Sequence, residues 1–171
     1  MPSITLVQNR IANTSVGPST VRGQPKNTVA TARKYLAGIN LQEFTSLRSE
    51  LDFRKLLDDH TLKLSEKLPW GFARKVINIF LFEAVHNILI DRQYELQKIS
   101  TWLEVPLDNP NAKKLKRYAR THRIYLEWTN IQSLKPEVNA KFQVIAKSCA
   151  QTEYQDERCY LDLHWWRPIE K

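Results

Sequence analysis

Residues 70–90 read WGFARKVINIFLFEAVHNILI and contain the longest apolar stretch of the chain. Large apolar side chains recur there at intervals of three and four residues, at Val76, Ile77, Phe80, Leu81, Ala84, Val85, Ile88 and Leu89. This spacing places them on one wide face of an α-helix. Polar residues such as Asn78 and Glu83 interrupt the stretch, so it is a poor candidate for a bilayer span. We therefore predict a long central helix that begins near Trp70.

The sequence on both sides predicts more helices and no paired strands. Apolar spacing, cap residues and prolines indicate helices at about 28–39, 41–47, 49–68, 94–102, 111–122, 136–150 and 160–166. The expected fold class is all-α, with one compact helical domain over residues 27–171. Residues 1–26 are rich in Ser, Thr, Asn, Gly and Pro and have few large apolar groups, which predicts a flexible or draped N-terminal arm.

The chain is basic: 26 Lys and Arg face 18 Asp and Glu among 171 residues, a formal net charge of +8. Such an excess favours a polyanionic partner, although it also serves simple solubility. The N-terminus is unlike a secretory signal, and no window is apolar enough to span a bilayer. We expect a cytoplasmic, monomeric protein with no membrane contact.

Metal and cofactor chemistry finds little support in the sequence. The two cysteines, Cys149 and Cys159, have no CxxC spacing, and the four histidines are scattered without a ligand motif. We expect no metal site and no cofactor.

Residues 111–123 predict a helix with uncompensated positive charge. Six cations and no acid lie in it: Lys113, Lys114, Lys116, Arg117, Arg120 and Arg123. Like charges on one helix repel, so a solvated face normally intersperses acids, and phosphate is the natural partner. An alternative is that the acids of residues 50–59 cover this helix. We predict that the six cations, together with Arg74, contact DNA.

Lys75 and Asp108 are the candidate chemical groups. Lys75 lies just inside the start of the central helix beside Arg74, where the helix dipole favours a reactive amine over an ammonium. Many lysines in such places only extend along apolar surface to water. Asp108 lies between Pro106 and Pro110, directly before the basic helix, where it predicts an N-cap. A capping carboxylate can also face a substrate.

The two residues lie in a pattern that resembles the helix-hairpin-helix DNA glycosylases. Residues 68–75 read LPWGFARK, and after an apolar helix residues 104–108 read EVPLD. In that superfamily a Leu-Pro-Gly-x-Gly-x-Lys hairpin is followed by a Val-Asp loop with a catalytic aspartate. The long gap is most similar to the archaeal 8-oxoguanine DNA glycosylases. The resemblance covers about residues 68–116, and Trp70 replaces the first hairpin glycine. It implies a trimmed glycosylase fold in which Lys75 and Asp108 are catalytic.

The resemblance also implies a function in base excision. The enzyme would flip a modified or damaged base out of double-stranded DNA and cleave its N-glycosidic bond, in DNA repair or antiviral defence. A lyase step would follow if Lys75 attacks the sugar. The expected base pocket contains Trp70, Phe72 and Trp102, with Trp128, Trp165 and Trp166 as further aromatic candidates. The alternatives are a non-enzymatic nucleic-acid-binding module and a protein–protein adaptor.

Overall fold

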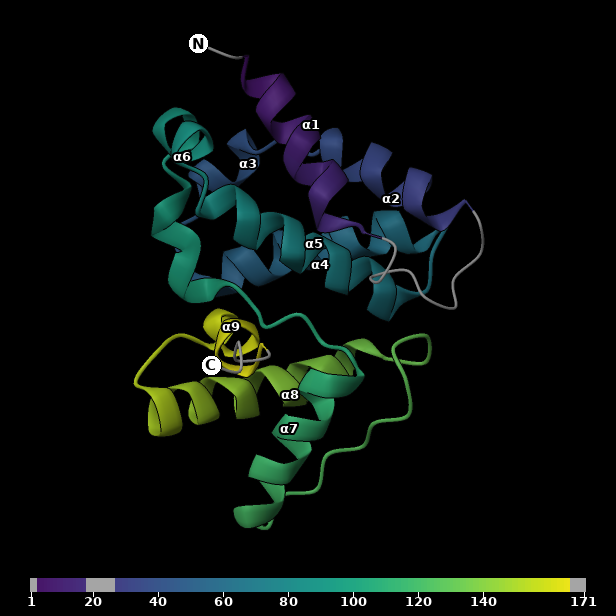
Figure 1. The fold of residues 1–171 in the computed structure, drawn as a ribbon, viewed down its shortest axis with the longest axis vertical. Coiled ribbons are helices and arrows are strands. Elements are labelled where there is room, and N and C mark those ends of the chain that lie inside the picture. Colours follow the sequence, from purple (N-terminus) through teal and green to yellow (C-terminus); the bar gives the residue numbers. More distant parts are fainter. Residues whose placement is uncertain (1–2, 18–26, 167–171) are drawn as a thin grey trace, which may run out of the picture.

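The computed structural model describes residues 3–17 and 27–166, and its ordered elements are all helical (Figure 1). The α-helices are α1 (Ile4–Ser15), α2 (Thr28–Ala37), α3 (Gln42–Thr45), α4 (Glu50–Ser65), α5 (Trp70–Val85), α6 (Ile88–Tyr94), α7 (Asn109–Thr121), α8 (Pro136–Cys149) and α9 (Leu161–Trp165). Two 3₁₀ segments, η1 (Leu96–Trp102) and η3 (Arg158–Tyr160), and a π-helical turn, η2 (Ala150–Tyr154), complete them. The predicted all-α class is confirmed.

Helix α5 is the central element, as its sequence predicts. Its side chains are buried on most of its circumference, and it packs against α1, α2, α4, α6 and η1. The predicted helix through residue 90 is wrong in one respect, because α5 ends at Val85. Asn87 starts α6 there, since its Oδ1 accepts hydrogen bonds from the backbone N–H groups of Leu89 and Ile90.

Helix α1 corrects the prediction of an N-terminal arm over residues 1–26. Ser3 caps this helix, and Ile11 and Ala12 are buried against the neighbouring helices. Gln8 is buried as well, and its Nε2 donates to the carbonyls of Leu36, Ala37 and Ile39 at the end of α2. This amide replaces the large apolar groups that the sequence lacks. Residues 18–26 of the predicted arm lie outside the described residues.

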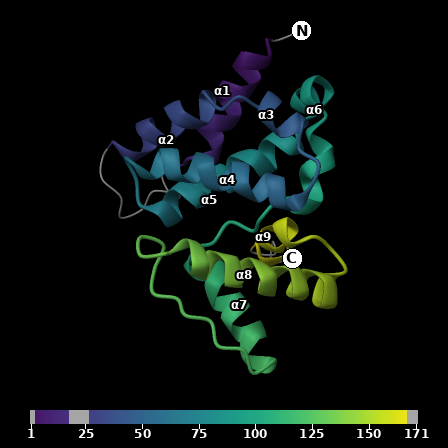
Figure 2. The same cartoon turned by 180° about the vertical axis from the view of Figure 1, so that it is seen from behind.

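The helices form two lobes, each with its own hydrophobic cluster (Figures 1 and 2). The N-terminal lobe comprises α1 to η1, and the C-terminal lobe comprises α7 to α9. Residues 103–107 connect them. Gln143 of α8 fixes this connection because its side chain accepts from Val105 N at 3.1 Å and donates to Val105 O at 2.9 Å. Within the described ranges, no helix is long and apolar enough to cross a membrane.

Candidate functional site

The connection between the lobes brings Lys75 and Asp108 together. Lys75 lies in the second turn of α5, and its Nζ is 3.1 Å from Oδ2 of Asp108. The Lys75 side chain is 13% exposed and that of Asp108 is 29% exposed, so the ion pair is partly shielded from water. An amine and a carboxylate that are 33 residues apart in sequence thus form one chemical unit.

Asp108 also caps α7, as its sequence position predicts. Its Oδ1 accepts a hydrogen bond from the backbone N–H of Asn111 at 3.0 Å, while Oδ2 receives Lys75. Its backbone is extended, as is typical of an N-cap residue. The Asp108 carboxylate therefore caps the start of α7 and also binds the Lys75 ammonium.

The Lys75–Asp108 pair lies at a cavity of about 730 Å³ between the lobes. The cavity is lined by Thr14, Ser15, Lys75, Ile79, Phe82, Glu83, Pro106, Asp108, Pro110, Cys159, Asp162, Leu163 and Trp166. Apolar groups from α5 and from the end of α9 line it together with the charged pair. Its volume lies in the range of small-molecule sites, and a mostly apolar wall with a few polar groups is typical of ligand sites.

Cys159 is the cavity's sulfur group, and it is a poor nucleophile. Burial raises the pKa of its thiol to about 12, so it stays protonated near neutral pH. Among the described residues, no group of three or more His, Cys, Asp or Glu side chains is placed to hold a metal ion.

The expected base pocket of Trp70, Phe72 and Trp102 is corrected by the structure, because none of the three lines this cavity. Phe72 is fully buried, and Trp102 packs against Phe53 at 6.3 Å between ring centroids. Trp70 packs on the C-terminal cluster. The aromatic groups at the cavity are Phe82 and Trp166. Phe82 follows Lys75 by seven residues, which is the spacing of one helix face, so periodicity measured from the lysine could have indicated it.

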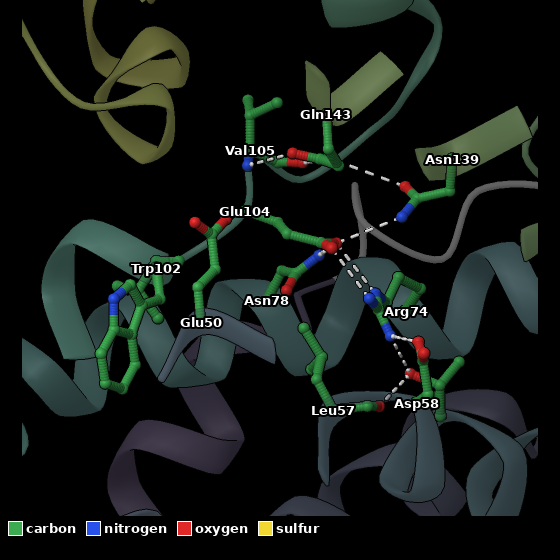
Figure 3. A network of polar contacts seen from close by, with 12 residues as sticks. Glu50, Leu57, Asp58, Arg74, Asn78, Trp102, Glu104, Val105, Asn139 and Gln143 are labelled. Carbon is green, nitrogen blue, oxygen red and sulfur yellow. Dashed lines mark hydrogen bonds and ion pairs between the residues drawn. The ribbon is translucent and has the colours of Figure 1, made fainter. Parts of the chain in front are cut away.

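Arg74 was expected to contact DNA, but it lies in the core (Figure 3). Its Nε and Nη2 donate to the two carboxylate oxygens of Glu104 at 2.9 and 2.8 Å, and its Nη1 contacts Asp58 at 2.7 Å. Its guanidinium is therefore paired on both sides within the protein. We remove Arg74 from the residues that could bind DNA.

Glu104 gathers a polar network where the lobes meet. Asn78 of α5 and Asn139 of α8 both donate to its Oε2 at 3.2 Å (Figure 3). Burial by itself would raise the pKa of Glu104, but the Arg74 guanidinium and these donors outweigh it and hold the pKa below its usual value. A buried ionised carboxylate thus links the two lobes beside the Lys75 site.

The six cations of residues 111–123 lie on the surface, with Lys116 half-buried and the others exposed. None forms an ion pair with a residue in the described part of the chain. The acids of residues 50–59 do not cover them: Glu50 pairs with Lys147 and Arg158, and Asp58 pairs with Arg74. The charge of α7 is therefore free to meet an external anion.

The basic helix reaches the mouth of the cavity. The Lys114 ammonium lies 5.5 Å from the ring centroid of Trp165, and the next residue, Trp166, lines the cavity and is 74% exposed. Asp108 at the start of α7 lines the same cavity. The start of α7 and the Lys75–Asp108 pair therefore adjoin the same cavity.

Gly71 shows what replaces the hairpin of the glycosylase pattern. A Cβ at this position would lie 2.2 Å from the carbonyl oxygen of Ile131 and 2.7 Å from Cβ of Leu134. The start of α5 is therefore occupied by the protein's own turn before α8. The protein's own backbone occupies the place at Gly71 where a hairpin would approach a phosphate group.

A second hollow, of about 770 Å³, lies between α2 and α4. It contains Tyr35 and His60, joined by a 2.9 Å hydrogen bond, and lysines and glutamates at its rim. It contains neither Lys75 nor Asp108. The smaller of the two cavities is thus the one with the candidate chemistry.

Comparison with known proteins finds no relative. No protein-family model, no curated protein and no solved structure matches the chain.

Proposed function

We propose that this protein is a DNA glycosylase that removes a modified or damaged base by cleaving its N-glycosidic bond. The observation that supports this most is the Lys75–Asp108 pair, set in a cavity large enough to admit a base at the end of an unpaired basic helix. Each part has a place in such a reaction. The basic helix α7 holds the phosphate backbone, the cavity receives the flipped base, and the charged pair meets the sugar.

Asp108 has the chemistry that the bond cleavage requires. Loss of the base leaves positive charge on the sugar, and a fixed carboxylate stabilises that charge in a partly dry site. The cap hydrogen bond from Asn111 and the ion pair with Lys75 hold this carboxylate in place before substrate arrives. It needs no rearrangement during the reaction.

We propose that hydrolysis, and not covalent attack by Lys75, is the main route. To act as a nucleophile the ammonium of Lys75 would have to lose a proton and leave Asp108. The start of α5 is also held by the turn near Ile131 and does not have the glycosylase hairpin geometry. Lys75 would then orient Asp108 and a substrate phosphate.

The test is base release from DNA. Purified protein is incubated with genomic DNAs that carry different base modifications, and free bases and abasic sites are measured by mass spectrometry and an aldehyde probe. We expect one class of modified DNA to yield both products. Absence of release from every DNA, with intact binding, would overturn the proposal.

A second candidate is a non-enzymatic nucleic-acid-binding module, which the unpaired cations of α7 favour. It shares the expected salt-dependent binding but not the chemistry. The base-release experiment separates the two.

A further inference from the structure

Asp162 is a second carboxylate in the cavity that the glycosylase pattern does not include. It lies in the first turn of α9 and lines the same cavity as Lys75 and Asp108. We propose that Asp162 is the general base that activates the attacking water. This inference rests on the proposed function.

Asn111 holds both carboxylates. Its backbone N–H donates to Asp108, while its side-chain Nδ2 donates to Oδ1 of Asp162 at 2.7 Å and to the carbonyl of Pro106 at 2.8 Å. Asn111 is 3% exposed, so this bridge is fixed in the protein interior. Asn111 therefore lies between the two carboxylates and holds each of them by a hydrogen bond.

The two carboxylates differ in how many of their oxygens are already hydrogen-bonded within the protein. Asp108 uses Oδ1 for the cap and Oδ2 for Lys75. Asp162 uses Oδ1 for Asn111, and its Oδ2 has no partner among residues 3–17 and 27–166. A general base needs a free lone pair within reach of the water, and Asp162 has one.

Glu83 is the other acid at the cavity, and it is less suited to the task. Its side chain is exposed, and no described residue forms a hydrogen bond or ion pair with it. An exposed carboxylate that nothing holds in place does not fix a water. Two fixed carboxylates with different environments are the arrangement that glycoside hydrolysis uses to divide its roles.

The reaction then proceeds with Asp108 and Asp162 in separate roles. A water oxygen forms a bond to the anomeric carbon of the sugar while the bond from that carbon to the base nitrogen breaks. Asp162 accepts one proton of the water and later returns it to solvent. The base leaves with the electron pair of the broken bond and takes up a proton from solvent. Asp108 stabilises the positive charge of the sugar throughout.

The experiment compares Asp162→Asn with Glu127→Gln, because each removes one negative charge and the exposed Glu127 does not line the cavity. Asp162→Asn keeps an oxygen that can accept from Asn111. Under single-turnover conditions on the modified DNA that wild type cleaves, we expect Asp162→Asn to slow base release by about 100-fold or more and Glu127→Gln to leave it within about threefold. DNA affinity and melting temperature should stay near wild type in both.

Chemical rescue distinguishes a base from a structural group. Asp162→Ala should regain base release when sodium formate is added, because formate supplies a carboxylate in the space left behind. A second sample with sodium chloride at equal ionic strength should not respond. Asp108→Ala should not respond to formate in the same way.

The outcomes separate this inference from the proposed function. Wild-type activity in Asp162→Asn, or an equal loss of activity in Glu127→Gln, would overturn the role of Asp162 and leave the glycosylase proposal standing. A slow Asp162→Ala that formate does not restore would also overturn it. Absence of base release in wild type would overturn both.

Discussion

Asp108 performs two tasks with two oxygens, and a single substitution separates them. Asp108→Asn keeps an oxygen for the cap of α7 but removes the negative charge that faces the sugar in the proposed reaction. We predict a loss of base release of at least about 100-fold with DNA affinity within about twofold of wild type. Single-turnover assays and fluorescence anisotropy measure the two. Wild-type turnover in this variant would remove Asp108 from the mechanism.

An experiment on Lys75 distinguishes the proposed hydrolytic route from covalent catalysis. We predict that sodium borohydride added during wild-type turnover traps no protein–DNA adduct, that abasic sites accumulate uncut, and that Lys75→Gln retains slow base release. Gel shift and peptide mapping measure the adduct. A borohydride-stable adduct on Lys75, absent from Lys75→Gln together with strand cleavage, would establish the covalent route instead.

Local sequence patterns predicted Lys75 and Asp108 as candidate residues. They did not predict the neighbouring residues that contact them in the folded protein. Lys75 and Asp108 were found because each lies at the start of a helix with a recognisable signal. Arg74 was misassigned, because a cation near a helix start looks the same whether Glu104 neutralises it or water does. Asp162 was missed, because a single acid 54 residues beyond Asp108 carries no local signal of its partner Asn111.

At the level of the elements, α7 is the expected electrostatic contact. Lys113, Arg117 and Arg120 are exposed and follow one side of the helix. We predict that their triple substitution by Glu weakens DNA binding across all sequences and lowers the slope of log K against log salt by about 3, since each phosphate contact contributes about 0.9. Titrations at several salt concentrations measure it.

The matched control for α7 substitutes three exposed lysines of the N-terminal lobe, Lys55, Lys63 and Lys67, by Glu. The change of net charge is the same. An equal loss of slope in both triple variants would show that total charge, and not α7, determines binding.

The start of α5 is tied to the C-terminal lobe through Gly71. We predict that Gly71→Ala lowers the free energy of unfolding by about 1–3 kcal/mol, because the new methyl group overlaps the Ile131 carbonyl and Leu134. Gly38→Ala is the control, since its methyl group would meet carbonyls only at 3.5 and 3.6 Å. Urea unfolding measures both, and equal stability of the two variants would contradict the packing argument.

Apolar spacing predicted the positions of the helices whose buried face is apolar. It did not predict helices whose buried face is partly polar. Helices α2, α4, α7 and α8 lie close to their predicted positions. Helix α1 was predicted as an arm because part of its buried face is Gln8 and Ser15. Ser15 donates within α1 to the carbonyl of Ile11, but Gln8 is buried because distant carbonyls at the end of α2 accept its hydrogen bonds, which a local pattern does not reveal.

On the scale of the whole molecule, Arg74 and Glu104 link the lobes through a buried charge. We predict that Glu104→Gln lowers the free energy of unfolding at pH 7 by about 3 kcal/mol, because it leaves Arg74 with Asp58 as its sole carboxylate. The exposed Glu127→Gln should change it by less than about 0.5 kcal/mol. Urea unfolding measures these differences, and equal effects would contradict the network.

The same carboxylate sets an expected pH dependence. The pKa of Glu104 is lower in the folded protein than its ordinary 4.5, so its contribution to stability is present above pH 4.5 and is lost as pH falls toward the folded value. Unfolding curves should show wild type losing stability in this acid range more steeply than Glu104→Gln. Parallel declines would assign the acid sensitivity to other groups.

The walls of the cavity come from both ends of the described chain. Ser15 of α1 and Trp166 after α9 line it together with residues from the middle of the sequence. Synthesis therefore has to reach Trp166 before the cavity can close. The basic helix α7 leaves the ribosome earlier than α9, so under the proposed function a growing chain would bind nucleic acid before it has a complete pocket.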